Sequence, residues 1–89
     1  MLERELTVPN RLGLHARATA KLVQALAPFR CTVTLAAKGR EVNAKSIMGV
    51  MLLAAGQGTP VTVRTDGDDE AAAMEAVVSL FERRFDEDA

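Results

Sequence analysis

The sequence predicts an α+β fold in which three helices cover one face of a four-stranded antiparallel sheet. Its 89 residues are enough for one domain, residues 1–89. Four short segments alternate apolar and polar residues, as half-buried strands do, and three longer ones repeat apolar residues every three or four positions, as helices do. They follow in the order strand, helix, strand, strand, helix, strand, helix. This order favours a sheet layer covered by a helix layer.

The first strand is expected over residues 2–8, with its apolar residues on one face. After the loop PNRLG, whose proline and glycine break regular structure, residues 16–27 are rich in helix formers, and Pro28 ends that helix. The residues expected to face the core are Leu2, Leu6 and Val8 in the strand, and Ala16, Ala20, Val23 and Ala27 beside Leu22, Leu26 and Phe29 in the helix.

Residues 31–44 are expected to form a hairpin that turns at Gly39, which can adopt a positive φ. A short helix over residues 47–55 has Ser46 as its N-cap. A strand over residues 60–65 and an amphipathic helix with an acidic start complete the chain. The residues expected to face the core are Cys31, Val33 and Leu35 in the hairpin, Val61 and Val63 in the later strand, and Met74, Val77, Val78, Phe81 and Phe85 in the last helix.

Composition and charge exclude several classes of function. Eleven basic and twelve acidic side chains give a net charge of −1, and the sequence has no Trp or Tyr. It therefore offers neither the basic face nor the aromatic platforms that bind nucleic acids. No apolar run approaches the roughly 20 residues of a membrane-spanning helix, and the first residues have no signal core. With a single cysteine besides, we expect a cytoplasmic protein without membrane insertion or nucleic-acid binding.

The stretch GLHARAT places the only histidine, His15, directly before a predicted helix. The first N–H groups of a helix lack intrahelical partners, and the helix dipole favours negative charge there. A phosphate at this point would meet the backbone N–H groups of Ala16, Arg17 and Ala18, and the guanidinium of Arg17 suits phosphate oxygens. The pattern favours a histidine that accepts and gives up a phosphoryl group. The alternative is a surface histidine beside a solvated arginine.

Other chemistry at His15 has less support in the sequence. One histidine and one cysteine do not complete a zinc site, so no metal is expected. No partner that would orient His15 as a base can be identified, which argues against hydrolysis. The acidic stretch DGDDE, residues 66–70, lacks the ligand pattern of a calcium loop and is expected to cap the last helix.

Ser46 and the helix after it are the second candidate region. A phosphate on Ser46 would be favoured by the helix N-terminus and would place charge beside Ile47 and Met48. The helix has almost no polar face, and a chain this short cannot bury all of it. Because methionines fit varied surfaces, we expect Ile47, Met48 and Met51 to contact a partner. Core packing and simple helix capping are the alternatives.

The stretches GLHAR (13–17) and AKSIMGVM (44–51), with the terminal helix, closely resemble HPr, the histidine-containing phosphocarrier family of the bacterial phosphoenolpyruvate-dependent phosphotransferase system. The resemblance covers essentially the whole chain and implies an open-faced β-sandwich. It implies that His15 accepts a phosphoryl group at Nδ1 from enzyme I, itself charged by phosphoenolpyruvate. The group then passes to the A domains of enzyme II (enzyme IIA), and Arg17 assists at the phosphoryl group.

The resemblance also implies regulation. In many members the serine matching Ser46 is phosphorylated from ATP by HPr kinase/phosphorylase, which lowers carrier activity, and residues matching Ile47, Met48 and Met51 dock partners. We expect a monomeric carrier for sugar uptake or regulation, needing no cofactor and not an enzyme itself. One alternative is a regulatory binding module controlled by Ser46 with little transfer role. Another is a plain interaction domain.

The chain departs from the usual family pattern at Ala18, and two other stretches resemble different branches of the family. Ala18 stands where the usual pattern is His-x-Arg-Pro, and both proline and alanine suit a first helical turn. Alanine restores an N–H, so we expect the rigidity of the turn to change and the chemistry to stay the same. The tail LFERRFDED resembles the nitrogen-related branch, whereas AKSIMGVM resembles carriers subject to serine phosphorylation.

Overall fold

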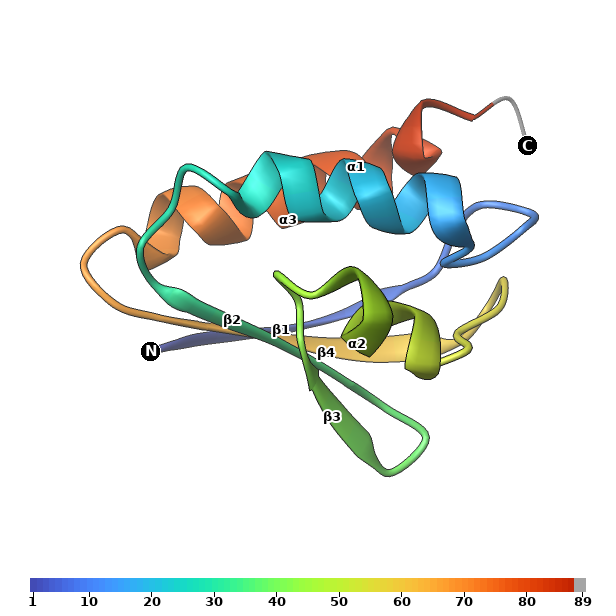
Figure 1. Ribbon diagram of the computed structural model, residues 1–89, viewed down its shortest axis with the longest axis horizontal. Helices are drawn as coiled ribbons and strands as arrows, with labels where there is room; N and C mark the ends of the chain where they lie inside the picture. Colours follow the sequence, from blue (N-terminus) through green and yellow to red (C-terminus); the bar gives the residue numbers. More distant parts are fainter. Residues whose placement is uncertain (88–89) are drawn as a thin grey trace.

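The computed structural model describes residues 1–87 and confirms the predicted order of elements. Four antiparallel strands lie in the order β1-β4-β2-β3. Three helices cover one face of this sheet and leave the other open, so the fold is an open-faced α+β sandwich (Figure 1). The elements are β1 (Leu2–Thr7), α1 (Ala16–Leu26), β2 (Thr32–Ala37), β3 (Arg40–Asn43), α2 (Ile47–Leu52), β4 (Pro60–Asp66) and α3 (Glu70–Glu82), followed by a C-terminal turn (Arg84–Asp86).

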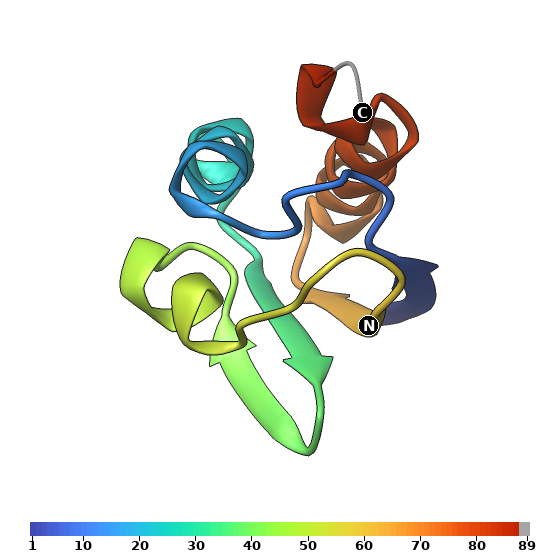
Figure 2. The ribbon, with the colours of Figure 1, turned by 90° about the vertical axis from the view of Figure 1, so that its right-hand side faces the viewer.

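The core lies between the helices and the covered faces of β2 and β4. Val33, Leu35, Val61 and Val63 are all buried there, which confirms the alternation predicted for these strands. α1 and α3 lie side by side above the sheet, and α1 also packs against α2 (Figure 2). Gly39 has the positive φ, 78°, that the predicted hairpin turn requires. Within residues 1–87, no helix combines the length and apolar character needed to cross a membrane.

The buried face of α1 agrees only in part with the predicted one. Ala18, Leu22 and Leu26, spaced four residues apart, are fully buried, whereas Ala16 and Ala27 are exposed. Burying a leucine removes more apolar area from water than burying an alanine, so the two leucines set the orientation of the helix. The predicted stripe of alanines is therefore wrong, and the neighbouring leucine stripe is confirmed.

β1 is less buried than predicted. Leu2 is exposed and Leu6 is half-buried, while Val8, just after the strand, is buried. β1 pairs only with β4, so its outer side has no neighbouring strand. Placing Leu2 in the core was wrong for this reason.

α2 ends three residues earlier than the predicted helix over residues 47–55. Ala54 adopts a left-handed φ of 51°, which a continuing helix does not allow. The next carbonyl, that of Ala55, accepts a hydrogen bond from the Leu14 backbone N–H at 2.9 Å. The segment after α2 is therefore bound to the loop before α1.

α3 also ends before the last residue of its predicted stripe. Met74, Val77 and Phe81 are buried as predicted, but Phe85 lies in the C-terminal turn, whose three residues all have positive φ. Phe85 is nonetheless fully buried, and its ring centroid lies 5.1 Å from that of Phe81. The periodicity therefore predicted the burial of these residues, although Phe85 lies in a turn and not in the helix.

The acidic stretch before α3 binds loop amides. Asp69 takes the N-cap position, but its carboxylate accepts hydrogen bonds from the backbone N–H groups of Arg30 (2.8 Å) and Cys31 (2.9 Å). The Arg30 hydrogen bond is the main cause that holds the pKa of Asp69 below its usual value. Asp69 therefore ties the start of α3 to the start of β2. The acidic stretch begins the helix as predicted, but the Asp69 side chain makes no capping hydrogen bond to it.

Candidate functional site

His15 directly precedes α1, as the sequence predicted, and the structure shows that it is the N-cap of this helix. Its backbone is extended (φ −77°, ψ 178°), and its carbonyl accepts the first intrahelical bond, from the Thr19 N–H at 2.9 Å. Its imidazole Nδ1 accepts a hydrogen bond from the backbone N–H of Arg17 at 3.3 Å. The ring thus does what a serine or aspartate side chain does at most helix starts: it satisfies an orphan backbone donor.

The loop before His15 is held by a turn from Asn10 to Gly13. The Gly13 N–H donates to the Asn10 carbonyl at 3.1 Å, and Asn10 Nδ2 donates to the Gly13 carbonyl at 2.7 Å. Gly13 has a φ of +70°, and a Cβ there would lie 2.6 Å from the carbonyl oxygen of Ala55. Only glycine fits this position, so the approach of the chain to His15 is fixed.

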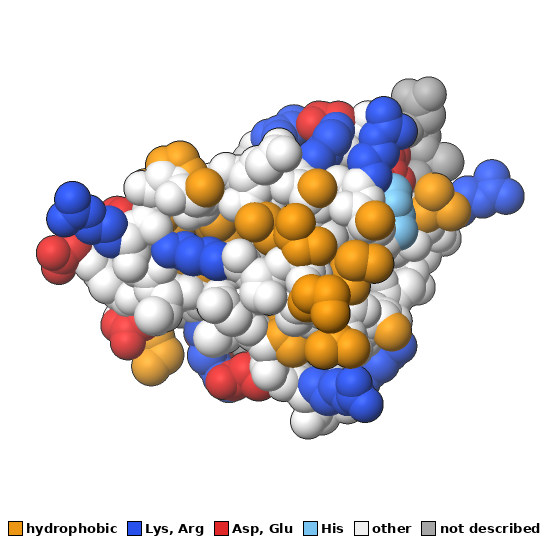
Figure 3. All heavy atoms as spheres, in the orientation of Figure 1, with side chains coloured by type: hydrophobic (Ala, Val, Ile, Leu, Met, Phe, Trp, Pro, Cys, Tyr) orange, Lys and Arg blue, Asp and Glu red, His pale blue; other side chains and the backbone are white. Residues whose placement is uncertain are grey.

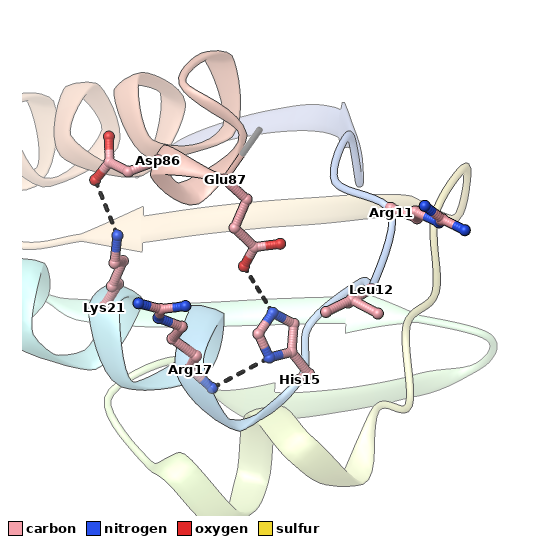
Figure 4. A pocket seen from close by; sticks show the side chains of 7 residues that line it. All are labelled: Arg11, Leu12, His15, Arg17, Lys21, Asp86 and Glu87. Carbon is pink, nitrogen blue, oxygen red and sulfur yellow. Dashed lines mark hydrogen bonds and ion pairs between the residues drawn. The ribbon is translucent and has the colours of Figure 1, made fainter. Parts of the chain in front are cut away.

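The second ring nitrogen, Nε2, lies 2.6 Å from Oε2 of Glu87 (Figure 4). An ionised carboxylate only accepts hydrogen bonds, so Nε2 carries the proton. Nδ1 accepts from the Arg17 N–H, so Nδ1 carries the lone pair. These two partners assign the tautomer of His15: Nε2–H, with Nδ1 as the nucleophilic nitrogen.

Glu87 is ionised in this arrangement. Burial acts to raise the pKa of its carboxyl, but the hydrogen bonds from Asn10 and His15 outweigh it, so the pKa lies below its usual value. The Glu87 side chain is 15% exposed and that of His15 is 26% exposed. The pair is thus sheltered while the histidine ring still reaches the surface.

A pocket beside His15 carries charges of both signs (Figure 4). On the side of α1 stand the cations Arg17 and Lys21, and on the side of the C-terminal tail stand Asp86 and Glu87. The exposed position of Arg17, two residues after His15, leaves its guanidinium available to an incoming anion. The residues that line the pocket are Arg11, Leu12, His15, Arg17, Lys21, Asp86 and Glu87.

The first turn of α1 contains the residues predicted to offer N–H groups to a phosphate. Ala16 and Arg17 are exposed, and the side chain of Ala18 is fully buried. Ala18 is the third helical residue, before the first intrahelical bond made by Thr19, so its N–H has no acceptor within the helix. A proline at this position would remove that donor.

Ser46 is confirmed as the N-cap of α2, because its Oγ accepts from the Gly49 N–H at 3.1 Å. α2 is divided as predicted: Val50 is fully buried, while the other side is exposed. Exposed apolar side chains lie on both sides of the histidine, and we call them together the apolar patch (Figure 3). The apolar patch consists of Leu12, Ile47, Met48, Met51 and Leu52.

Sequence reasoning missed Glu87, Asn10 and Lys21. Glu87 is 72 residues from His15, and Asn10 is 77 residues from Glu87. The acidic tail was visible in the sequence, but only the fold brings it to the start of α1. Leu12 and Leu52 were also missed as members of the apolar patch.

The chain matches a known protein family over most of its length. Residues 2–83 match the PTS-HPr family, described as "PTS HPr component phosphorylation site". The chain is 69% identical over 88 residues to the phosphocarrier protein HPr of Xylella fastidiosa (strain Temecula1), with 99% of each chain covered. It is 55% identical over 87 residues to that of Cupriavidus necator, with 98% of each covered.

A solved structure agrees with these sequence matches. The crystal structure of HPr-C-His from Thermoanaerobacter tengcongensis superposes with a TM-score of 0.96 at 40% identity and covers 100% of both chains. The match therefore holds for the fold over the whole length as well as for the sequence. The chain belongs to the HPr family, the phosphocarrier proteins of the phosphotransferase system.

Proposed function

We propose that the protein accepts a phosphoryl group from phosphorylated enzyme I on Nδ1 of His15 and passes it to enzyme IIA domains in the cytoplasm. The observation that carries this proposal is the pair of contacts on the ring. Nε2 is engaged with Glu87, and Nδ1 has its lone pair directed at the start of α1. A nucleophile is thereby placed where a helix N-terminus favours an anion.

The transfer step needs no proton to leave His15. The Nδ1 lone pair forms a bond to phosphorus, while the bond from phosphorus to the donor breaks and its electron pair stays with the donor. The ring keeps its Nε2 proton and becomes cationic, and the phosphoryl oxygens bear the negative charge. Passing the group to an acceptor reverses these changes at His15. Such chemistry depends on positioning and charge neutralisation more than on acid–base catalysis.

Four groups at the start of α1 support binding of the phosphoryl oxygens. The Arg17 N–H already points at Nδ1, so a small shift would let it donate to an oxygen on the attached phosphorus. The N–H groups of Ala16 and Ala18 belong to the same helical turn and lack intrahelical acceptors. The Arg17 guanidinium supplies positive charge in a fork that matches phosphate oxygens.

The experiment is to incubate the protein with enzyme I and labelled phosphoenolpyruvate. Acid-labile label is expected on the wild type, and His15→Ala should carry none. The matched control is Ser46→Ala, which should still accept label on His15. Label on His15→Ala would overturn the assignment.

A second candidate is a regulatory binding module controlled by Ser46, with little transfer role. It is favoured by the place of Ser46 at the start of α2, whose exposed side contributes four of the five residues of the apolar patch. A phosphate there would put charge beside an otherwise uncharged docking surface. If cells tolerate His15→Ala but respond to Ser46→Asp, this candidate replaces the first. A mass increase of one phosphate on Ser46, produced by ATP and HPr kinase/phosphorylase, would show that the modification occurs.

A further inference from the structure

A chain of hydrogen bonds joins Asn10, Glu87 and His15. Both carboxylate oxygens of Glu87 accept a hydrogen bond: Oε1 from Asn10 Nδ2 at 3.1 Å, and Oε2 from His15 Nε2 at 2.6 Å. A glutamine at this position has one acceptor and one donor, so it would turn an N–H group toward one of the two donors. A carboxylate at position 87 can therefore accept from both donors, whereas a glutamine can accept from only one.

Asn10 is oriented for this contact. Its side chain is fully buried, and Nδ2 uses its two hydrogens on the Gly13 carbonyl and on Glu87. Within residues 1–87, Oδ1 of Asn10 has no hydrogen-bond partner. Leaving a buried acceptor unpaired is costly, so the amide is held here by its two donated bonds. Turning it over would place Oδ1 against two other oxygens.

The tail that carries Glu87 is held in a strained form. Arg84, Phe85 and Asp86 all have φ between 54° and 61°, a region that costs roughly 1–2 kcal/mol for each non-glycine residue. Two contacts oppose this strain. Phe85 is fully buried, and Lys21 of α1 donates to the Phe85 carbonyl at 3.0 Å and to Asp86 Oδ2 at 3.2 Å.

The position of Glu87 matters for the proposed transfer step. When Nδ1 binds phosphorus, the ring becomes cationic, and Nε2–H faces the Glu87 carboxylate at hydrogen-bond distance. The other charged groups of the pocket are Arg11, Arg17, Lys21 and Asp86. Asp86 is engaged by Lys21 and by Arg83 (3.0 Å), so Glu87 is the carboxylate of this pocket that contacts the ring.

We propose that Glu87 is a positioning residue for phosphoryl acceptance: braced by Asn10, it holds His15 as the Nε2–H tautomer and balances the charge of the phosphorylated ring. This rests on the proposed function. A similar arrangement holds metal-binding histidines, where a carboxylate on one nitrogen fixes the tautomer and makes the other nitrogen a better ligand.

The test has two readouts. NMR of the isotopically labelled imidazole nitrogens reports the tautomer without any phosphoryl donor. Wild type should show a protonated Nε2 and an unprotonated Nδ1, whereas Glu87→Gln and Glu87→Ala should show a mixture of tautomers. Labelling by enzyme I and phosphoenolpyruvate should then be slower by about 10- to 100-fold in both variants.

Two further variants separate positioning from general damage. Glu75→Gln removes an exposed carboxylate on α3 and should change neither the tautomer nor the rate. Lys21→Met keeps Glu87 but removes two contacts that hold the tail, so it should shift the tautomer in the same direction. Overlaid backbone amide spectra would show that each variant is folded.

The proposal is overturned if Glu87→Gln and Glu87→Ala keep the wild-type tautomer and labelling rate. It is also overturned if Glu75→Gln slows labelling as much as they do. If wild type itself accepts no label, the proposed function fails, whereas the NMR result still decides whether Glu87 holds the ring.

Discussion

The helices α1 and α2 both begin with a side-chain N-cap, but the residues around the two caps differ. At α1 the cap is His15, whose Nδ1 accepts from the N–H two residues on; at α2 it is Ser46, whose Oγ accepts from the N–H three residues on. At α1, Arg17 and Lys21 stand on the helix, and Glu87 of the tail contacts the cap. At α2, exposed apolar side chains follow the cap.

The difference shows that a helix cap by itself is not a reactive group. Both caps satisfy backbone donors and both stand where a helix favours negative charge. Only the first also has a lone pair oriented by a carboxylate on the opposite ring nitrogen and an arginine beside it. Chemistry is therefore expected at α1 and docking or regulation at α2.

The largest effect should come from exchanging each cap for asparagine, which is itself a good N-cap. His15→Asn should abolish labelling by enzyme I and phosphoenolpyruvate, because the nucleophilic nitrogen is gone. Ser46→Asn should keep it. Chemical denaturation should show that both variants remain folded. Equal loss of labelling in the two would break the comparison.

The two regions meet at Gly13, which touches the carbonyl after α2. Gly13→Ala adds a Cβ at 2.6 Å from the Ala55 carbonyl oxygen and keeps a left-handed φ, so it should lower the free energy of unfolding by about 2–4 kcal/mol. Gly39→Ala is the matched control. Its φ is also positive but its Cβ would meet open space, so the loss should be about 1–2 kcal/mol. Equal losses in urea denaturation would contradict the close contact.

Arg17 should matter for the reaction more than for stability. Arg17→Gln should lower the rate of phosphoryl acceptance by about 10- to 100-fold, because a charged fork for phosphate oxygens is lost. Arg4→Gln, on exposed β1, is the control and should leave the rate unchanged. A rate for Arg17→Gln equal to that control would remove Arg17 from the site.

Ser46→Ala tests the structural half of the comparison. Loss of the bond from Gly49 should cost about 1 kcal/mol of stability, the usual value for an N-cap. Thermal unfolding measures this, and the labelling rate at His15 should not change. A slower rate would mean that the two helix starts are coupled.

The smallest expected effect is in the pH dependence of stability. The pKa of Glu87 is lowered on folding, so its contribution is present above the unfolded value of about 4.3 and is lost as pH falls through the folded value. Unfolding free energies between pH 5 and 3, where Asp69 and Asp86 also contribute, should therefore fall less steeply in Glu87→Gln than in wild type. Parallel curves would indicate that Glu87 is not held in the folded state.

The sequence predicted those features of the fold that depend on residues close together in the chain. The order of elements, the hairpin turn at Gly39, the start of a helix just after His15 and the cap Ser46 follow from local patterns, and the structure confirms them. The end of α2 depends on a contact with the loop before α1, which local periodicity does not contain.

Only part of the candidate site could be predicted, because the other residues reach it through contacts between distant parts of the chain. His15 and Arg17 lie two residues apart, so one short stretch reveals both. Glu87 reaches the ring only because the left-handed turn buries Phe85 and redirects the tail, and Asn10 joins it through a side-chain contact across the molecule. A pattern of alternating or periodic residues does not report such a turn.

The central claim is that Nδ1 of His15 is the atom that receives the phosphoryl group. NMR of the phosphorylated protein with labelled imidazole nitrogens measures this directly, through the coupling between phosphorus and the bonded nitrogen. The account predicts phosphorus on Nδ1 and a retained proton on Nε2. Phosphorus on Nε2, or on any residue other than His15, would contradict it.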